Sequence, residues 1–290
     1  WCRVKEPTKP LSWAAFLGKL WGERFPVDVR TIAMDYSTRF TDPIKTILAA
    51  PVENFEGALC PLPNAGKWAI LYNPAISSPG RINFTLAHEL GHYLVHRHLR
   101  PDGFECGERN LLGLDRDTAR KAIEQEADLF ASHLLMPKED FRAQVRRADL
   151  TLKLLVHCAD RYGVSRTAAA LKWIDLTDEC AVVVAATNGF VLWSWRSVRA
   201  KQRGLWFPIG MELPEDAWAA SASSDVIDPR GMEHDAGTWH DLMSAREITI
   251  FAPRHEMTVS VVIFGNENLD SGWYSEPVED SYDRFIAGPS

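Results

Sequence analysis

The chain has 290 residues, of which 46% are hydrophobic and 24% are charged, and its formal net charge is −7 at pH 7. These values fit one large or two ordinary globular domains and exclude a disordered chain or a coiled coil. The negative charge argues against a dedicated nucleic-acid binder. Acidic residues are in clear excess only after residue 176, which indicates two units with different surfaces.

The five cysteines are scattered and none forms a C-x-x-C pair, so the pattern predicts free thiols and no thiolate zinc site. The first twenty residues mix charged residues and prolines with apolar ones, unlike a signal peptide. No apolar run reaches the ~18 residues that a membrane span needs. We therefore expect a protein of the reducing cytoplasm that makes no membrane contact.

In the first third of the chain, helical patterns give way to short extended ones. Residues 11–22 have helical spacing, and a second short helix is expected to end near Met34. The clearest extended segments are Gly57–Leu62 and Trp68–Tyr72, with a turn-rich stretch between them. We expect a small antiparallel sheet here.

The middle third is mostly helical. Residues 81–98 form a strongly helical segment, residues 101–118 are expected to be loops, and a second strong helix is expected over residues 117–133. Residues 138–176 contain further helices, including a short pair hinged at residues 163–165.

The last third has the pattern of strands. Two extended segments flank Asn188-Gly189, and this dipeptide favours a tight hairpin turn. Residues 247–252 and 257–264 form a second expected strand pair. The whole pattern predicts an α+β protein.

The sequence His88-Glu89-Leu90-Gly91-His92 predicts a metal site. Residues four apart lie on one helix face, so both imidazoles can point a nitrogen at one zinc ion. Glu89 stands beside the first ligand, where its carboxylate can take a proton from water activated by the metal. The pattern therefore predicts a zinc-dependent peptidase, although Mn²⁺ accepts the same donor set.

A third protein ligand is expected on the next helix. The apolar positions of residues 123–134 define its buried face, and Glu124 falls nearer the centre of that face than Glu126. We therefore favour Glu124 as the ligand, with Glu126 as a solvated carboxylate. Asp128, one turn after Glu124, is placed to accept a hydrogen bond from a ligand histidine and fix its tautomer. His96 is expected to pack near the site without binding the metal.

Two stretches resemble the ImmA/IrrE family of bacterial metallopeptidases: residues 81–96, which contain HELGH, and residues 124–137 (EQEADLFASHLLMP). The resemblance covers roughly residues 10–175. It implies a thermolysin-like (gluzincin) minimal domain in which His88, His92 and Glu124 bind zinc and Glu89 is the general base. It also implies a helix-turn-helix-like middle segment and a GAF-like C-terminal domain, as in the IrrE branch.

The resemblance implies a function as well. Family members typically cleave a helix-turn-helix repressor and so derepress stress-response, DNA-damage or mobile-element genes. On this basis we expect a metallopeptidase domain at residues 1–137, a helix-turn-helix-like segment at 138–177 and an α+β sensor or regulatory domain at 178–290.

Two questions stay open on the sequence. The segment 151–175 has the form of a DNA-binding helix-turn-helix, but its second helix is rich in alanine, which favours a packing or docking role. The alternative to a peptidase is a non-catalytic, zinc-stabilised regulatory or antitoxin-like binding protein. Glu89 argues against that alternative, because a structural zinc site needs no base. The oligomeric state is not indicated.

Overall fold

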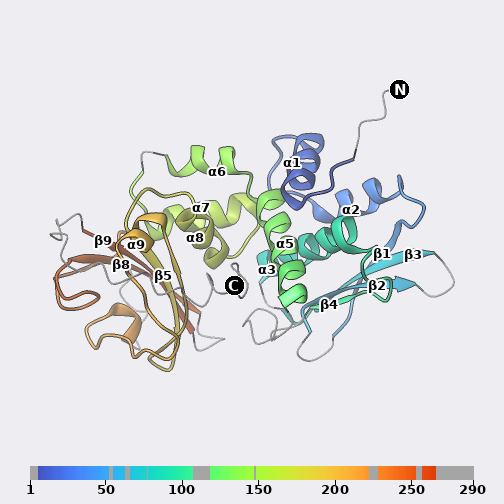
Figure 1. Ribbon diagram of the computed structural model, residues 1–290. Helices are drawn as coiled ribbons and strands as arrows, with labels where there is room; N and C mark the ends of the chain where they lie inside the picture. The colour runs from blue at the N-terminus through green and yellow to red at the C-terminus, as the bar shows by residue number, and fades with distance from the viewer. Residues whose placement is uncertain are drawn as a thin grey trace. The chain divides into compact units, whose positions relative to one another are not determined.

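The computed structural model is a mixed α+β protein, which confirms the expected class (Figure 1). The residues that the structure describes are 6–51, 55–62, 66–76, 78–106, 118–146, 148–221, 228–252 and 257–265. The chain divides into two compact units, residues 1–141 with 159–165 and residues 142–158 with 166–290. The segment 138–177 is shared between these units, and the three-part division expected from the sequence stays a prediction.

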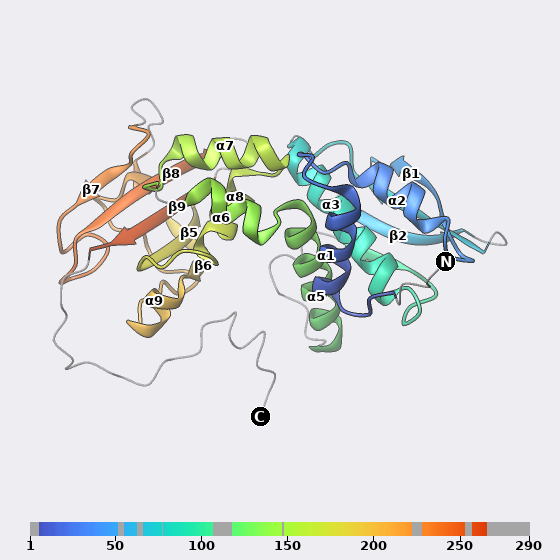
Figure 2. The same ribbon diagram turned by 90° about the horizontal axis from the view of Figure 1, so that it is seen from above.

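The first unit combines helices with a four-stranded sheet. Its helices are α1 (Pro10–Trp21), α2 (Val29–Ser37), α3 (Pro79–Gly91), the π-helical turn η1 (His92–His96) that continues α3, and α5 (Thr118–Leu135). Its strands are β1 (Ile44–Ala49), β2 (Gly57–Leu62), β3 (Lys67–Tyr72) and β4 (Phe104–Cys106). Figures 1 and 2 show α2 and α3 on the sheet and α5 packed against α3 and α1.

The sheet of the first unit is mixed, not antiparallel throughout as expected. Its order is β1-β3-β2-β4, and β2 pairs antiparallel with both β3 and β4, but β1 pairs with β3 in parallel. In the β2–β3 hairpin, β3 is the strand that lies next to β1. The alternation of apolar and polar residues does not indicate which strand of a hairpin pairs with a third strand, or in which direction. The expected loop at residues 101–118 contains β4, and the described part of that segment ends with this strand.

The second unit contains the strand-rich part of the chain. Its strands are β5 (Ala181–Thr187), β6 (Phe190–Arg196), β7 (Met232–His234), β8 (Ala245–Ala252) and β9 (Met257–Phe264). They form one sheet in the order β6-β5-β9-β8-β7, with every neighbouring pair antiparallel. Both expected hairpins are confirmed, and Asn188 and Gly189 have the positive φ angles, 50° and 80°, that the tight turn requires.

Further helices belong to the middle and the second unit. They are α6 (Lys138–Val145), α7 (Leu152–Tyr162), α8 (Arg166–Ile174), α9 (Val198–Gln202) and the 3₁₀ turn η2 (Trp218–Ala220). The hinge between α7 and α8 lies where the sequence predicts it. Among the described helices, none combines the length and the apolar character that crossing a bilayer requires.

Strand β5 is the centre of the second unit's core. All of Ala181–Ala186 is buried, so the strand is covered on both faces. Helix α8 packs against it through buried residues that include Ala169, Ala170 and Trp173. The other face meets the long connection between β6 and β8, which contributes Leu205, Phe207 and Trp239 to the core. The helical segment and the sheet therefore share one hydrophobic core, and cutting the chain near residue 178 would expose α8.

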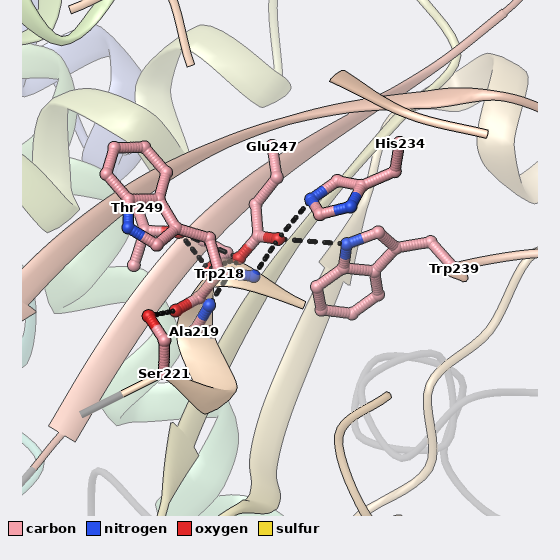
Figure 3. A network of polar contacts seen from close by, with 8 residues as sticks. Trp218, Ala219, Ser221, His234, Trp239, Glu247 and Thr249 are labelled. Carbon is pink, nitrogen blue, oxygen red and sulfur yellow. Dashed lines mark hydrogen bonds and ion pairs between the residues drawn. The ribbon is translucent and has the colours of Figure 1, made fainter. Parts of the chain in front are cut away.

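A carboxylate is buried within this second core. Glu247, on β8, is fully buried, and its two oxygens accept hydrogen bonds of 2.8–3.1 Å (Figure 3). The donors are the backbone N–H groups of Trp218 and Ala219, the ring N–H groups of His234 and Trp239, and the hydroxyls of Thr249 and Ser260. Because every partner donates, the carboxyl group is ionised. Its hydrogen bonds link η2 and His234 of β7 to β8.

The pKa of Glu247 lies below its ordinary value. Burial by itself raises this pKa, but the hydrogen bonds from His234, Thr249 and the backbone N–H groups of Ala219 and Trp218 lower it by more. A carboxyl whose folded pKa is lowered stabilises the fold above its unfolded pKa of about 4.3, and this contribution is lost as the pH falls.

We predict that Glu247→Gln lowers the free energy of unfolding by about 2–4 kcal/mol at pH 7, because the amide NH₂ then faces donors. Denaturant unfolding of the full chain, followed by tryptophan fluorescence, measures this loss. The difference in unfolding free energy between the variant and wild type should shrink at pH 3.5, where the wild-type carboxylate contributes less stability. An equal difference at both pH values would contradict the assignment.

Candidate metal centre

Helix α3 carries the histidine pair at its C-terminal end. Ser78 caps its first turn by accepting a hydrogen bond from the backbone N–H of Arg81, and Pro79 occupies the first helical position, where no donor is needed. His88 lies in the last turn of α3 and His92 begins η1. Both are buried, 8% and 0% exposed, so their rings face the interior of the first unit.

A close crossing of α3 and α5 brings a carboxylate to this pair. Gly91 lies at the crossing, and a Cβ atom added there would stand 3.0 Å from Cδ1 of Phe130 and 3.3 Å from Cα of Ala127. The space beside Gly91 is filled by α5, and Glu124 thereby reaches the histidines.

The three expected ligand side chains converge. Nε2 of His88 and Nε2 of His92 are 2.9 Å apart, and Oε2 of Glu124 lies 3.2 Å from the first and 3.6 Å from the second. Two ligands bound to one zinc at 2.0–2.2 Å are about 3.3–3.6 Å apart in a tetrahedron. The two Nε2–Oε2 distances lie at or near this range, whereas the Nε2–Nε2 distance is shorter, so the imidazoles would separate slightly around a zinc ion, with a fourth position left for water or substrate.

The neighbouring acids of α5 point elsewhere. Oε2 of Glu126 lies 2.9 Å from Nε2 of His96, so Glu126 does not face the paired imidazoles. Oδ1 of Asp128 lies 2.8 Å from Nδ1 of His88, the contact that the helix spacing predicts. The Glu126 side chain is 50% exposed, as expected of a solvated carboxylate, and it also contacts the buried His96, which the sequence did not predict.

The environment keeps these groups in metal-binding form. Burial lowers the pKa of His92 to about 3, although contact with Glu124 opposes the shift. Burial raises the pKa of the Glu124 carboxyl, but its contacts with His88 and His92 outweigh this and hold it well below the usual range. At neutral pH, His92 is therefore neutral and Glu124 ionised, as a divalent cation requires.

Residues 44–173 match the sequence model of one family, described as the IrrE N-terminal-like domain of peptidase family M78. This stretch contains the whole His-His-Glu set. Over this stretch the chain is similar to that domain.

Comparison with solved structures extends beyond the domain. A Mycobacterium tuberculosis transcriptional regulator superimposes with a TM-score of 0.52 and 13% sequence identity, and the match covers 88% of this chain and 76% of that one. At this identity the likeness shows the fold alone. No curated protein matches the sequence.

Within the IrrE N-terminal-like domain, Glu89 lies against the sheet. It is fully buried, and a Cβ atom added to Gly57 of β2 would stand 3.0 Å from its Oε1 and 2.4 Å from Cγ2 of Thr85. The absence of a side chain at Gly57 is what leaves room for the Glu89 carboxylate. This contact could not be read from the sequence, since the two residues lie in different elements.

Two aromatic residues of the domain complete the surroundings of His92. The ring of Phe104, on β4, is stacked on the His92 imidazole, with centroids 4.3 Å apart and planes 11° from parallel. No sequence pattern marked Phe104, which lies in the expected loop. The neighbouring Tyr93 donates its hydroxyl proton to the carbonyl oxygen of Asp42 and is fully buried, so it has a structural role.

The α7–α8 hairpin offers little positive charge to a DNA backbone. Arg161 forms two hydrogen bonds of 2.9 Å with the Asp140 carboxylate, and Lys172 is only 3% exposed. Arg166, at the start of α8, is exposed. These observations favour the packing or docking role of the hairpin.

We predict that Gly57→Ala lowers the kcat/KM of peptide cleavage by at least about 100-fold, because its Cβ overlaps Cγ2 of Thr85 and lies 3.0 Å from Oε1 of Glu89, so that both side chains must shift. Zinc content, measured by elemental analysis, should stay at the wild-type level, since none of the three ligand side chains is among the nearest atoms that the Cβ meets. Gly18→Ala is the matched control, because a Cβ added there meets no atom within 4 Å. Wild-type cleavage by Gly57→Ala would refute the packing argument.

Proposed function

We propose that the chain is a zinc-dependent endopeptidase that cleaves a partner protein, a helix-turn-helix transcriptional repressor, and so derepresses stress-response or mobile-element genes. The observation that carries the proposal is the convergence of His88, His92 and Glu124 beside the buried Glu89. The similarity of residues 44–173 to a peptidase-family domain supports it.

The residues of the site divide the chemistry between them. A zinc ion held by His88, His92 and Glu124 supplies a Lewis acid that lowers the pKa of water and polarises the peptide carbonyl. Glu89 takes the proton from the attacking water and passes it to the leaving nitrogen. The packing of Gly57 against Glu89 holds this carboxylate still, which reduces the reorganisation needed during the reaction.

The position of β4 suggests where the substrate lies. Strand β2 lies between β3 and β4, and its backbone is occupied at Gly57–Leu59. Strand β4 ends the described sheet, and Phe104 contacts the ligand His92. An extended substrate segment would therefore add to β4 and present its peptide bond to the metal centre.

The assignment of a repressor as substrate rests on the family resemblance. The fold likeness to a transcriptional regulator fits a role in gene control. The second unit would then supply regulation, with its five-stranded sheet as the GAF-like sensor domain. A non-catalytic, zinc-stabilised binding protein is the alternative, and it predicts repressor binding without cleavage.

We predict that Glu89→Gln binds zinc with wild-type stoichiometry but loses cleavage by at least about 1000-fold, because the amide cannot accept the proton. A helix-turn-helix repressor serves as the substrate, incubated with and without a chelator and analysed by mass spectrometry. Glu23→Gln, at an exposed position of the same unit, is the control and should cleave normally. Persistent cleavage by Glu89→Gln would show that another group is the base, and chelator-resistant cleavage would exclude metal catalysis.

A further inference from the structure

We propose that His96 and Glu126 are positioning residues that hold the metal ligand His92 in its coordinating tautomer. The proposal rests on the proposed metal site and adds two residues that the peptidase chemistry by itself does not use. It follows from a chain of hydrogen bonds that runs from the surface of α5 to the centre.

The chain of contacts has two links. Nε2 of His96 lies 2.9 Å from Oε2 of Glu126, and Nδ1 of His96 lies 3.2 Å from Nδ1 of His92. His92 and His96 are both buried, 0% and 1% exposed, whereas the Glu126 side chain is half exposed. The relay therefore has one end in solvent and the other at the metal centre.

The direction of each hydrogen bond is fixed by elimination. An ionised carboxylate only accepts, so His96 donates to Glu126 through Nε2–H. A neutral imidazole has one donor and one acceptor, so Nδ1 of His96 is an acceptor and His92 must donate to it through Nδ1–H. Nε2 of His92 then carries the lone pair, and this is the atom that faces His88 and Glu124.

The other histidine obtains the same tautomer in a different way. Nδ1–H of His88 donates directly to Asp128, so Nε2 of His88 also carries the lone pair. The two Nε2 atoms and Oε2 of Glu124 then converge as three acceptors, an arrangement that favours a cation between them. Helix α5 thus supplies Glu124 as a metal ligand. Asp128 fixes the tautomer of His88, and Glu126, through His96, fixes that of His92.

The backbone explains why His96 can take part. Residues 92–96 form a π-helical turn, an uncommon geometry that is frequent at functional sites. Within this turn the Nδ1 atoms of His92 and His96, four residues apart, face each other. The stacked ring of Phe104 also holds the plane of His92, so orientation and tautomer are fixed by different neighbours.

Variants of Glu126 test the relay through zinc affinity, measured by competition with a chromophoric chelator. Glu126→Lys, which places a donor against Nε2 of His96, should weaken zinc binding by about 10–100-fold, and so should His96→Phe. Glu126→Gln should rescue the affinity to within about fivefold of wild type, because its amide oxygen still accepts. Glu23→Lys is the matched control for the charge reversal and should bind normally.

The tautomers are also measurable without any substitution. The ¹⁵N shifts of the histidine side chains in the full-length, zinc-loaded protein should report His96 with its proton on Nε2 and His92 with its proton on Nδ1. A proton on Nδ1 of His96 would overturn the relay, as would wild-type zinc affinity in both Glu126→Lys and His96→Phe.

These outcomes are distinguishable from failure of the proposed peptidase. A wild-type protein that binds zinc with the graded series above but cleaves nothing supports the relay and refutes the catalytic proposal. A wild-type protein that binds no zinc refutes both.

Discussion

The arrangement of the candidate site depends on one contact, the crossing of α3 and α5 at Gly91. The absence of a side chain there lets the backbone of α5 approach at Ala127, with the Phe130 ring against the same point. Each carboxylate of α5 then meets its own partner: Glu124 the paired Nε2 atoms, Glu126 the ring of His96, and Asp128 the outer nitrogen of His88. A helix displaced by a methyl group would lose these contacts together, because their tolerances are a few tenths of an ångström.

The orientation of α5 was predictable because it is a local property. The apolar stripe through Ala127, Phe130 and Ala131, all fully buried, places Glu124 toward α3 and lets Asp128 follow one turn later. The role of Glu126 was not predictable by the same reasoning. Helical angles give the side of the helix on which it lies, but they do not reveal that His96 of the neighbouring helix lies within its reach.

In the sheets too, features set by neighbouring residues could be predicted from the sequence, and features set by distant residues could not. The Asn188-Gly189 hairpin follows from the positive φ angles that its turn requires, so it can be read from a dipeptide. The parallel partner of β3 and the short strand β4 depend on pairings between distant segments. Glu247 was hidden for a related reason: Ile248 and Ile250 alternate with polar residues as in a half-exposed strand, but the long connection between β6 and β8 covers the polar face.

Glu247 and Glu124 differ in the groups that surround their carboxylates, and that difference separates a structural site from a functional one. Glu247 meets only donors, so its charge is compensated within the protein and it has no capacity left for a ligand. Glu124 meets two imidazole nitrogens that the neighbouring acids of α5 leave without protons. Three acceptors within 3.6 Å of one another repel unless a proton or a cation lies between them. A divalent cation bound by these three atoms would remove the repulsion, and Asp128 and, through His96, Glu126 favour the tautomers that leave this place open to it.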